Sequence, residues 1–237
     1  MNSTTDPTDE YDNGKYLTKN PTWHTEDSPY KASFVIDAID RNNLSPKRSA
    51  DIGCGAGLVT EILAKRYPAS SFVGYELSAN ARIFWSQRQK LPNLSYASDN
   101  LLELRDQFDL IVCLDVFEHV EDYFGFLRAL RCKGKNFIFN IPLDMNVMKL
   151  MTSGIKYARE EVGHLHYFSQ YSAIKTLEDC GYKISDQKLS VAFLSTPPRN
   201  IRQVLVLPIR LLSLVLGKSF ATRVFGGISL VVFATAD

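Results

Sequence analysis

Apolar residues along this chain recur at two spacings, one typical of buried strands and one typical of helices with a single apolar face. Short apolar runs predict seven strands, which end near residues 52, 76, 97, 114, 141, 194 and 234. The run from Phe108 to Leu114 is the most continuously apolar, as expected of a central parallel strand covered on both faces. Helical spacing fills most of the gaps between these runs, so strands and helices alternate.

Serine residues mark the starts of several predicted helices. Ser28 opens the first, and Ser78 opens a helix that we expect to continue to about residue 90. Ser169 opens a later helix, in which Tyr171 and Leu177 are expected to face inward. Strand–helix alternation at this spacing predicts an α/β fold with a doubly wound, Rossmann-like sheet of seven strands.

The length of 237 residues fits one α/β domain with a modest insertion. Residues 1–14 are polar and acidic, and nothing in them could offset their ordering entropy, so we predict a disordered tail there. We expect a single domain over residues 15–237. An apolar, basic insertion at 198–226 precedes its last strand.

The amino-acid composition limits which partners and which cellular compartment we expect for this protein. A formal net charge of +1 argues against a nucleic-acid binder that relies on a strong overall basic field. The four cysteines, Cys54, Cys113, Cys132 and Cys180, lack metal-ligand spacing, which suggests a reducing compartment. The first residues contain no apolar segment of a signal peptide, and no run of 18 apolar residues occurs. We therefore expect a cytoplasmic protein that does not bind nucleic acid.

A glycine-rich turn, Asp51-Ile52-Gly53-Cys54-Gly55-Ala56-Gly57, follows the first predicted strand. Such a turn lets backbone N–H groups approach a cofactor closely, but alone it is a weak signal that packing can also explain. Ligands of open parallel sheets lie outside the carboxyl ends of the strands. The turn therefore indicates a cofactor site at this edge of the sheet.

Acidic residues are predicted at the same edge, after each of the first four strands. They are Asp51, Glu76, Asp99 beside Asn100, and Asp115. A carboxylate at Glu76 can accept hydrogen bonds from both hydroxyls of a ribose. Several carboxylates around one pocket would repel a pyrophosphate and suit a cation. S-adenosylmethionine, which carries a sulfonium, an ammonium and a ribose but no phosphate, fits this pattern.

The segments ADIGCGAG, YELS, ASDN and FDLIVCLDVFEHV resemble the class I S-adenosylmethionine-dependent methyltransferases. They most resemble the bacterial small-molecule branch that includes the ubiquinone-biosynthesis enzymes. The resemblance implies S-adenosylmethionine as cofactor, a small-molecule acceptor, and an antiparallel last strand at residues 228–234.

The same resemblance assigns roles to residues at the predicted edge. Glycines would line the methionine portion, Glu76 would bind the ribose, and Asp99 with Asn100 would face the adenine. The full set that it assigns to the cofactor is Asp51, Gly53, Cys54, Gly55, Gly57, Glu76, Leu77, Asp99, Asn100, Asp115 and Val116.

Two histidines are the candidate catalytic residues. Methyl transfer depends mostly on aligning donor and acceptor, and a general base is needed only if the nucleophile must lose a proton. His119 belongs to the EH pattern after the fourth strand, and His164 matches the family's GH position before a helix. Each is either a general base or a brace for its loop. No further Cys or His ligands accompany His164 and His166, so the sequence predicts no metal site.

The insertion has an unusual charge pattern. Between Gln187 and Ala236 the chain has basic residues but no acidic residue. Leucine and valine cover most of a helical wheel through residues 202–213, and Pro208 is expected to break the segment into two helices. Peripheral contact of residues 199–225 with an anionic membrane is one interpretation, and a helical cap or a homodimer contact is the other. A lipid-linked acceptor would be consistent with the membrane contact.

Two other functions remain open on the sequence alone. An NAD-dependent oxidoreductase could use a similar glycine turn, but Asp99 and Asp115 would then have no role. An inactive S-adenosylmethionine-binding module would keep the glycines and carboxylates without turnover. We favour methyl transfer to a small or lipid-linked acceptor, through O-methylation.

Overall fold

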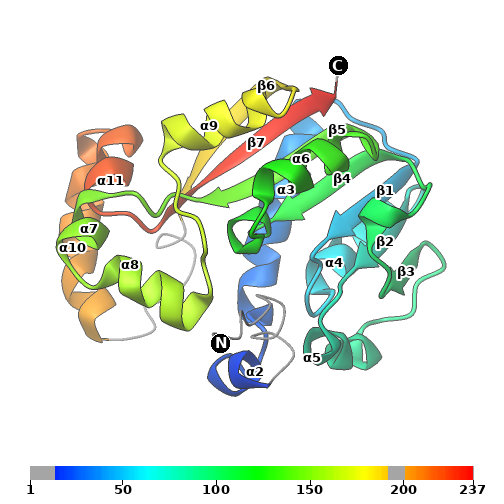
Figure 1. The fold of residues 1–237 in the computed structure, drawn as a ribbon, viewed down its shortest axis with the longest axis horizontal. Coiled ribbons are helices and arrows are strands. Elements are labelled where there is room, and N and C mark those ends of the chain that lie inside the picture. Colours follow the sequence, from blue (N-terminus) through cyan, green and yellow to red (C-terminus); the bar gives the residue numbers. More distant parts are fainter. Residues whose placement is uncertain (1–13, 192–200, 237) are drawn as a thin grey trace, which may run out of the picture.

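The computed structural model describes residues 14–191 and 201–236. The predicted tail at 1–14 lies almost wholly outside the described residues. Figure 1 shows a twisted sheet with helices on both faces and a group of helices at one end. The strands are β1 Arg48–Ile52, β2 Ser71–Tyr75, β3 Leu94–Ala97, β4 Phe108–Leu114, β5 Gly134–Pro142, β6 Tyr182–Val191 and β7 Ile228–Ala236.

All seven strands form one sheet in the order β3-β2-β1-β4-β5-β7-β6. Strands β1 to β5 pair in parallel, whereas β7 pairs antiparallel with both β5 and β6. The predicted Rossmann-like sheet and its antiparallel last strand are therefore confirmed. Parallel pairing brings the carboxyl ends of β1, β2 and β4 to one edge, where the glycine turn and the acidic residues follow.

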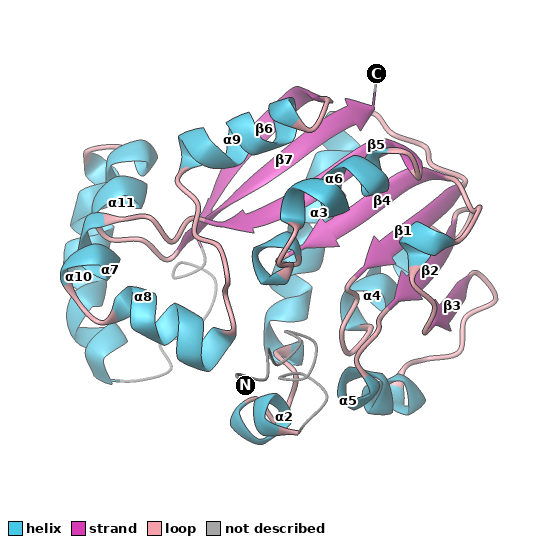
Figure 2. Ribbon diagram, in the orientation of Figure 1, coloured by secondary structure: helices cyan, strands magenta, loops and turns pink. Residues whose placement is uncertain are grey.

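Helices cover both faces of the sheet in a three-layer arrangement (Figure 2). One face packs against α3 Ser28–Arg41 and α4 Leu58–Arg66, and the other packs against α6 Tyr123–Arg131 and α9 Gln170–Asp179. Side chains of β4 alternate between the two layers, so its residues are buried on both faces. The strand thus has the position that its apolar run predicts.

Shorter helices lie beyond the sheet edges. They are α2 Lys15–Lys19, η1 Thr25–Asp27, α5 Ala79–Arg82, η2 Ile83–Gln87, η3 Leu101–Glu103, η4 Phe117–His119, α7 Val147–Met151, α8 Gly154–Tyr157 and η5 Ala158–Val162. The predicted helix from Ser78 to residue 90 is wrong in form, because one α-helical turn is followed by a 3₁₀ helix. Tyr171 is 74% exposed, so the prediction that it faces inward is also wrong.

The insertion before β7 contains two helices, α10 Ile201–Val215 and α11 Lys218–Val224. The expectation that Pro208 divides it is wrong, because Pro208 lies inside α10. The division falls at Gly217, whose φ of +105° is a conformation that L side chains rarely adopt. Within residues 14–191 and 201–236, none of the helices combines the length and hydropathy needed to cross a bilayer.

Candidate functional site

The glycine turn joins β1 to α4 with a backbone that depends on glycine. Gly53, Gly55 and Gly57 all have positive φ, and Gly57 is the N-cap of α4. A Cβ at Gly53 would lie 2.7 Å from a methyl carbon of Val116, so the turn passes close to the segment after β4. Two residues that the resemblance assigns to the cofactor, Gly53 and Val116, are thus in contact.

Glu76 is fixed directly beside this turn. Its Oε2 accepts a hydrogen bond from the backbone N–H of Gly55 at 2.9 Å, and its Oε1 accepts one from the N–H of Ser78 at 2.8 Å. Burial raises the pKa of Glu76, although these backbone N–H groups lower it in part. Each carboxylate oxygen keeps a second lone pair. The carboxylate is therefore held in one orientation and can still accept two hydrogen bonds from a ligand.

Three aromatic side chains surround the turn. The Trp85 indole N–H donates to the carbonyl oxygen of Gly55 at 3.0 Å, and Trp85 stacks on Tyr96 with ring centroids 5.0 Å apart. The Tyr96 hydroxyl donates to the carbonyl of Gly57 at 2.7 Å. Trp23 lies against Gly55, and its φ of +49° is unusual for a tryptophan. The segment before α3 therefore reaches the predicted cofactor site.

Asp51 is buried under the turn, with 3% of its surface exposed. The Thr60 hydroxyl of α4 donates to its Oδ2 at 2.6 Å, so the side chain ties β1 to the start of α4. Burial raises the pKa of Asp51 from 3.8 to about 7, with a smaller contribution from the charge of Glu76. The residue braces the turn from below.

This raised pKa makes the stability of the protein depend on pH. Between about pH 4 and pH 7 the unfolded carboxyl is ionised while the folded one keeps its proton, so the free energy of unfolding should fall as pH rises, by about 1.4 kcal/mol per pH unit. The Asp51→Asn variant should lack this contribution, so its free energy of unfolding should fall less steeply with pH than that of wild type, as measured by urea unfolding from pH 4.5 to 7.5. Asp109→Asn is a suitable control, because the pKa of Asp109 is lowered and its effect lies at more acidic pH. Parallel pH curves for wild type and Asp51→Asn would contradict the prediction.

Asp115, at the end of β4, is ion-paired and strained. Lys31 of α3 approaches its Oδ2 at 2.6 Å, and the side-chain amide of Asn140 donates to its Oδ1 at 2.7 Å. Its φ of +53° lies in the left-handed region. Burial acts to lower the pKa of Lys31, but the charge of Asp115 outweighs it and the pKa is raised. The predicted negative charge at this position is therefore balanced by a lysine that the sequence analysis did not single out.

The other predicted cofactor residues lie around the same edge. Leu77 is 52% exposed and Asp99 is also exposed, while Cys54 and Asn100 are half-buried. The Asn100 side chain accepts a hydrogen bond from the N–H of Leu102 at 3.1 Å and so caps η3. Leu77, Asp99 and Asn100 are therefore accessible to a ligand on the β2–β3 side of the turn, whereas the thiol of Cys54 lies against Gly74 of β2.

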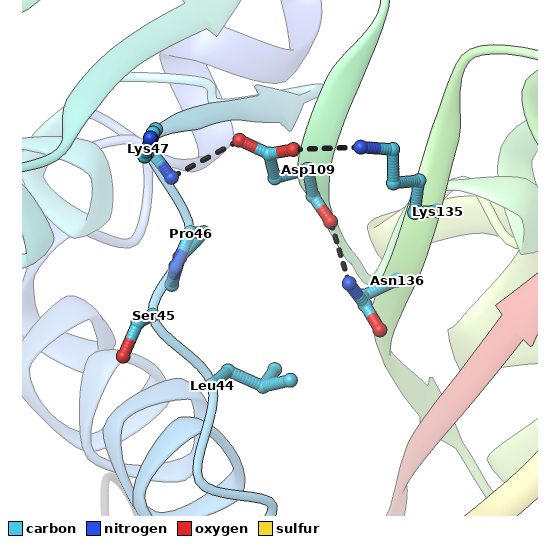
Figure 3. Close-up of a pocket in the computed structure, with 7 residues that line it drawn as sticks. All are labelled: Leu44, Ser45, Pro46, Lys47, Asp109, Lys135 and Asn136. Carbon is cyan, nitrogen blue, oxygen red and sulfur yellow. Dashed lines mark hydrogen bonds and ion pairs between the residues drawn. The ribbon is translucent and has the colours of Figure 1, made fainter.

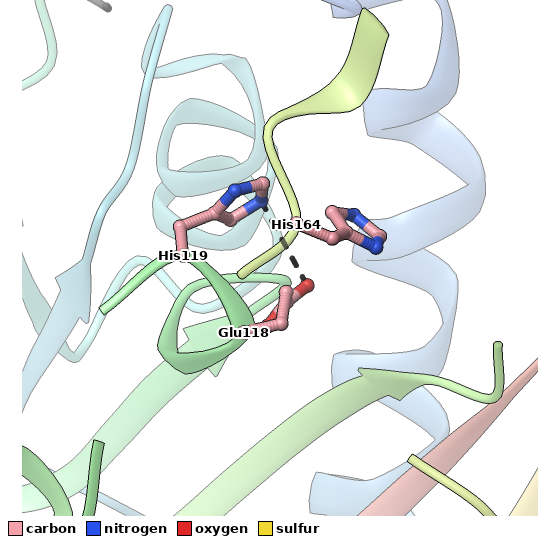
Figure 4. Close-up of side chains that lie close together, drawn as sticks. All are labelled: Glu118, His119 and His164. Carbon is pink, nitrogen blue, oxygen red and sulfur yellow. Dashed lines mark ion pairs between the residues drawn. The ribbon is translucent and has the colours of Figure 1, made fainter. Parts of the chain in front are cut away.

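A second polar cluster contains both candidate catalytic histidines (Figure 4). The rings of His119 and His164 lie with centroids 4.8 Å apart, and the His119 Nε2 is 4.0 Å from an oxygen of Glu118. His119 Nδ1 donates to the carbonyl of Gly163 at 3.0 Å. Burial lowers the pKa of His119 to about 4, so the ring is neutral at pH 7.

His164 is oriented by a carboxylate. Its Nδ1 donates to the Oδ2 of Asp144 at 2.6 Å, and Lys149 pairs with the other oxygen of Asp144. Burial acts to raise the pKa of Asp144, but these two partners outweigh it and the pKa is lowered. His166 lies apart and hydrogen-bonds the carbonyls of Val120 and Glu121. Neither Glu118 nor Asp144 was predicted from the sequence, because Asp144 acts on His164, 20 positions along the chain, and the burial of Glu118 is visible only in the fold.

A hollow of about 490 Å³ opens at the opposite edge of the sheet (Figure 3). It lies beside the amino ends of β1, β4 and β5, where Asp109 accepts hydrogen bonds from the N–H groups of Lys47 and Arg48 and from the ammonium of Lys135. The carboxylate of Asp109 is thus already hydrogen-bonded by groups of the protein itself. The location also differs from the carboxyl edge at which such sheets bind ligands.

Comparisons with known proteins identify the family to which the chain belongs. A family profile described as "Methyltransferase domain" matches residues 25–187, which is more than half of the chain. Ubiquinone biosynthesis O-methyltransferase of Aeromonas salmonicida (strain A449) is 28% identical over 145 residues, which are 57% of this chain and 59% of that protein. Trans-aconitate 2-methyltransferase of Deinococcus radiodurans is 31% identical over 46% of this chain and 44% of that protein. The chain thus spans less than two thirds of these curated relatives.

A solved structure extends the comparison to the whole chain. Magnesium protoporphyrin IX methyltransferase from Synechocystis PCC 6803, with bound S-adenosylmethionine, superposes with a TM-score of 0.60 at 13% identity and covers 100% of both chains. At this identity the likeness shows the fold. The match to the family profile also disfavours the oxidoreductase alternative. The chain belongs to the methyltransferase domain family, and its fold is that of the S-adenosylmethionine-dependent methyltransferases.

Proposed function

We propose that this protein transfers a methyl group from S-adenosylmethionine to an oxygen atom of a small or lipid-linked acceptor. The observation that carries the proposal is the carboxylate of Glu76, held beside the glycine turn by the N–H groups of Gly55 and Ser78. Two ribose hydroxyls can donate to its remaining lone pairs. Family membership and the names of the relatives support the reaction type.

If Glu76 binds the ribose, the positions of the other parts of the cofactor follow. Adenine would lie toward Asp99 and Asn100 after β3, and the methionine portion would lie along the glycine turn toward Asp115. Lys31 beside Asp115 adds a cation at that end, so the site offers both signs of charge to the amino and carboxylate groups of the methionine. Trp23 against Gly55 would cover the ligand from above.

A hydroxyl nucleophile must lose a proton during the reaction, whereas a carboxylic acid is already ionised at pH 7. We assign the promotion of this loss to His119 and His164, because both rings donate from Nδ1 and keep Nε2 as the basic nitrogen. The ubiquinone-biosynthesis and aconitate relatives are named for O-methylation and for methylation of a small acid. Either type of acceptor offers an oxygen.

The cofactor assignment is tested by calorimetry with S-adenosylhomocysteine and NAD in parallel. We expect saturable binding of one S-adenosylhomocysteine per chain and no binding of NAD. Binding of NAD alone would favour the oxidoreductase alternative. S-adenosylhomocysteine binding without methyl transfer to any of a panel of phenols, carboxylic acids and polyprenyl phenols would favour an inactive binding module.

The helices at one end of the molecule carry exposed apolar side chains that suit a lipid-linked acceptor. Here α7, α10 and α11 lie together (Figure 1). Met151, Leu212 and Val215 are 81%, 69% and 80% exposed. Lys218 and Arg223 of α11 are exposed basic residues. We propose that this surface contacts an anionic membrane.

Exchanging Lys218 and Arg223 for glutamate should weaken binding to anionic vesicles by at least about tenfold, since each basic residue near such a surface contributes about 1 kcal/mol. Flotation with phosphatidylglycerol vesicles measures this binding. Lys175→Glu, on helix α9, is the matched control. Equal recovery of wild type with and without vesicles would contradict the membrane contact, and a dimer mass that Val215→Glu converts to a monomer mass would assign the surface to a homodimer.

A further inference from the structure

We propose that Glu118, His119 and His164 form a binding site for one divalent transition-metal ion. One ligand atom from each residue lies within 4.8 Å of the other two. Glu118 and His119 come from the turn η4 after β4, and His164 comes from the loop after η5, so the fold brings together residues 45 positions apart (Figure 4).

The buried carboxylate of Glu118 is the strongest reason for a cation. Its side chain is 0% exposed, and neither oxygen has a hydrogen-bond partner among the described residues. Burying an ionised carboxylate without a partner is very costly, so the group must either hold a proton or face a cation. Lys31, the nearby lysine, is already paired with Asp115 at 2.6 Å.

The two histidines are arranged as metal ligands usually are. A ligating imidazole typically donates its other N–H to a carboxylate or a backbone carbonyl, which fixes the tautomer and the ring orientation. His164 donates from Nδ1 to Asp144, and His119 donates from Nδ1 to the carbonyl of Gly163. In both rings Nε2 is therefore the unprotonated nitrogen, which is the atom through which such an imidazole ligates a metal ion. A protonated Glu118 alone would not account for this arrangement of the histidines.

Two imidazoles and one carboxylate favour a particular class of ion. This donor set suits Zn²⁺, Fe²⁺ or Co²⁺ rather than Mg²⁺ or Ca²⁺, which prefer oxygen ligands. With bonds of about 2.1 Å, two ligand atoms can lie at most about 4.2 Å apart, so the side chains must close by about half an ångström on binding. Three ligands leave coordination positions for an acceptor oxygen.

A cation bound there would have a role in the proposed reaction, and that role rests on the proposed function. A metal ion polarises a coordinated hydroxyl and lowers its pKa, so with an ion bound the two histidines would promote proton loss as ligands of that ion and not by accepting the proton. The binding proposal itself does not depend on methyl transfer. Its test therefore measures the metal ion directly.

The test is a titration of the chelator-treated full chain with Co²⁺, followed by visible absorption, and with Zn²⁺, followed by calorimetry. Cys132→Ser serves as the background, because Cys132 is an exposed thiol that could bind either ion. We expect one ion per chain and the intense d–d bands of a four- or five-coordinate Co²⁺. Calorimetry with S-adenosylhomocysteine is run on the same samples, so failure of the metal site and failure of the cofactor site are distinguishable.

Variants separate ligands from neighbours. His164→Ala and Glu118→Gln should each remove the Co²⁺ bands, while Asp144→Asn should weaken Co²⁺ binding by about 10–100-fold through loss of His164 orientation. His166→Ala is the matched control and should bind Co²⁺ as wild type does, because His166 bonds only backbone carbonyls of the described residues.

Three results would overturn the proposal. They are no saturable binding of Co²⁺ or Zn²⁺ below millimolar concentration, Co²⁺ bands that persist unchanged in His164→Ala, and equal loss of the bands in His166→Ala and His164→Ala. A folded Glu118→Gln variant, verified by its melting temperature, ensures that loss of binding reports loss of a ligand.

Discussion

Replacing Glu76 by alanine should weaken the binding of S-adenosylhomocysteine by about 100-fold or more. The proposed site loses two charge-assisted hydrogen bonds to ribose hydroxyls, each of which contributes about 1.5–3 kcal/mol. The N–H groups of Gly55 and Ser78 also lose their acceptor, so the turn is no longer held in place. Calorimetric titration of wild type and variant measures the change.

The Glu76→Gln variant separates these two effects. Glutamine keeps the side-chain shape and one acceptor oxygen but loses the charge, so we expect an intermediate loss of roughly tenfold. Glu178→Ala, which removes an exposed carboxylate of α9, controls for a general effect of charge and should bind like wild type. If Glu76→Ala remains folded and binds S-adenosylhomocysteine within threefold of wild type, the ribose assignment is wrong.

The central strands could be predicted from the sequence, because a strand that is buried on both faces of the sheet must be apolar along its whole length. The prediction of Phe108–Leu114 matches β4 at both ends, since an unbroken apolar run can be satisfied only by cover on both faces. The start of β6 could not be predicted in the same way. It is an edge strand, and its residues from Lys183 to Lys188 are exposed or half-buried, so no apolar run marks residues 182–188.

Tertiary contacts explain why the helix predicted after Ser78 differs from the one in the structure. The predicted helix after Ser78 changes to 3₁₀ geometry at Ile83, where Trp85 turns to stack on Tyr96 and to donate to the carbonyl of Gly55. These partners lie on other elements of the fold. Local helical spacing carries no information about them, and propensity is easily outweighed by such contacts.

Some residues of the candidate site could be predicted from the sequence, and others could not. The glycines and Glu76 were predictable, because their roles follow from the position of a strand end that the sequence marks. Lys31 and Asp144 were not, since each acts through a partner on a distant segment, Asp115 and His164 respectively. Glu118 stood within a motif that the sequence analysis used, but its lack of a partner becomes visible only in the folded protein.

Replacing Gly57 by alanine should destabilise the protein by roughly 2–4 kcal/mol and lower its melting temperature by roughly 5–15 °C. The φ of +79° costs an L residue about 1–2 kcal/mol. The new Cβ would also lie 2.6 Å from the Tyr96 ring. That ring cannot retreat without losing its hydrogen bond to the Gly57 carbonyl and its stacking on Trp85. Urea unfolding and thermal melting measure both quantities.

Two controls isolate the steric part of this cost. Gly14 has nearly the same φ, +77°, but no atom of the described residues lies within 4 Å of its Cβ position, so the loss in Gly14→Ala should not exceed the backbone cost. Combining Gly57→Ala with Tyr96→Ala removes the clash, so the double variant should be more stable than the sum of the single changes predicts. Strict additivity, or a loss in Gly57→Ala no larger than in Gly14→Ala, would show that Tyr96 does not confine the turn. In that case, the proximity of Tyr96 would not explain why glycine stands at the start of α4.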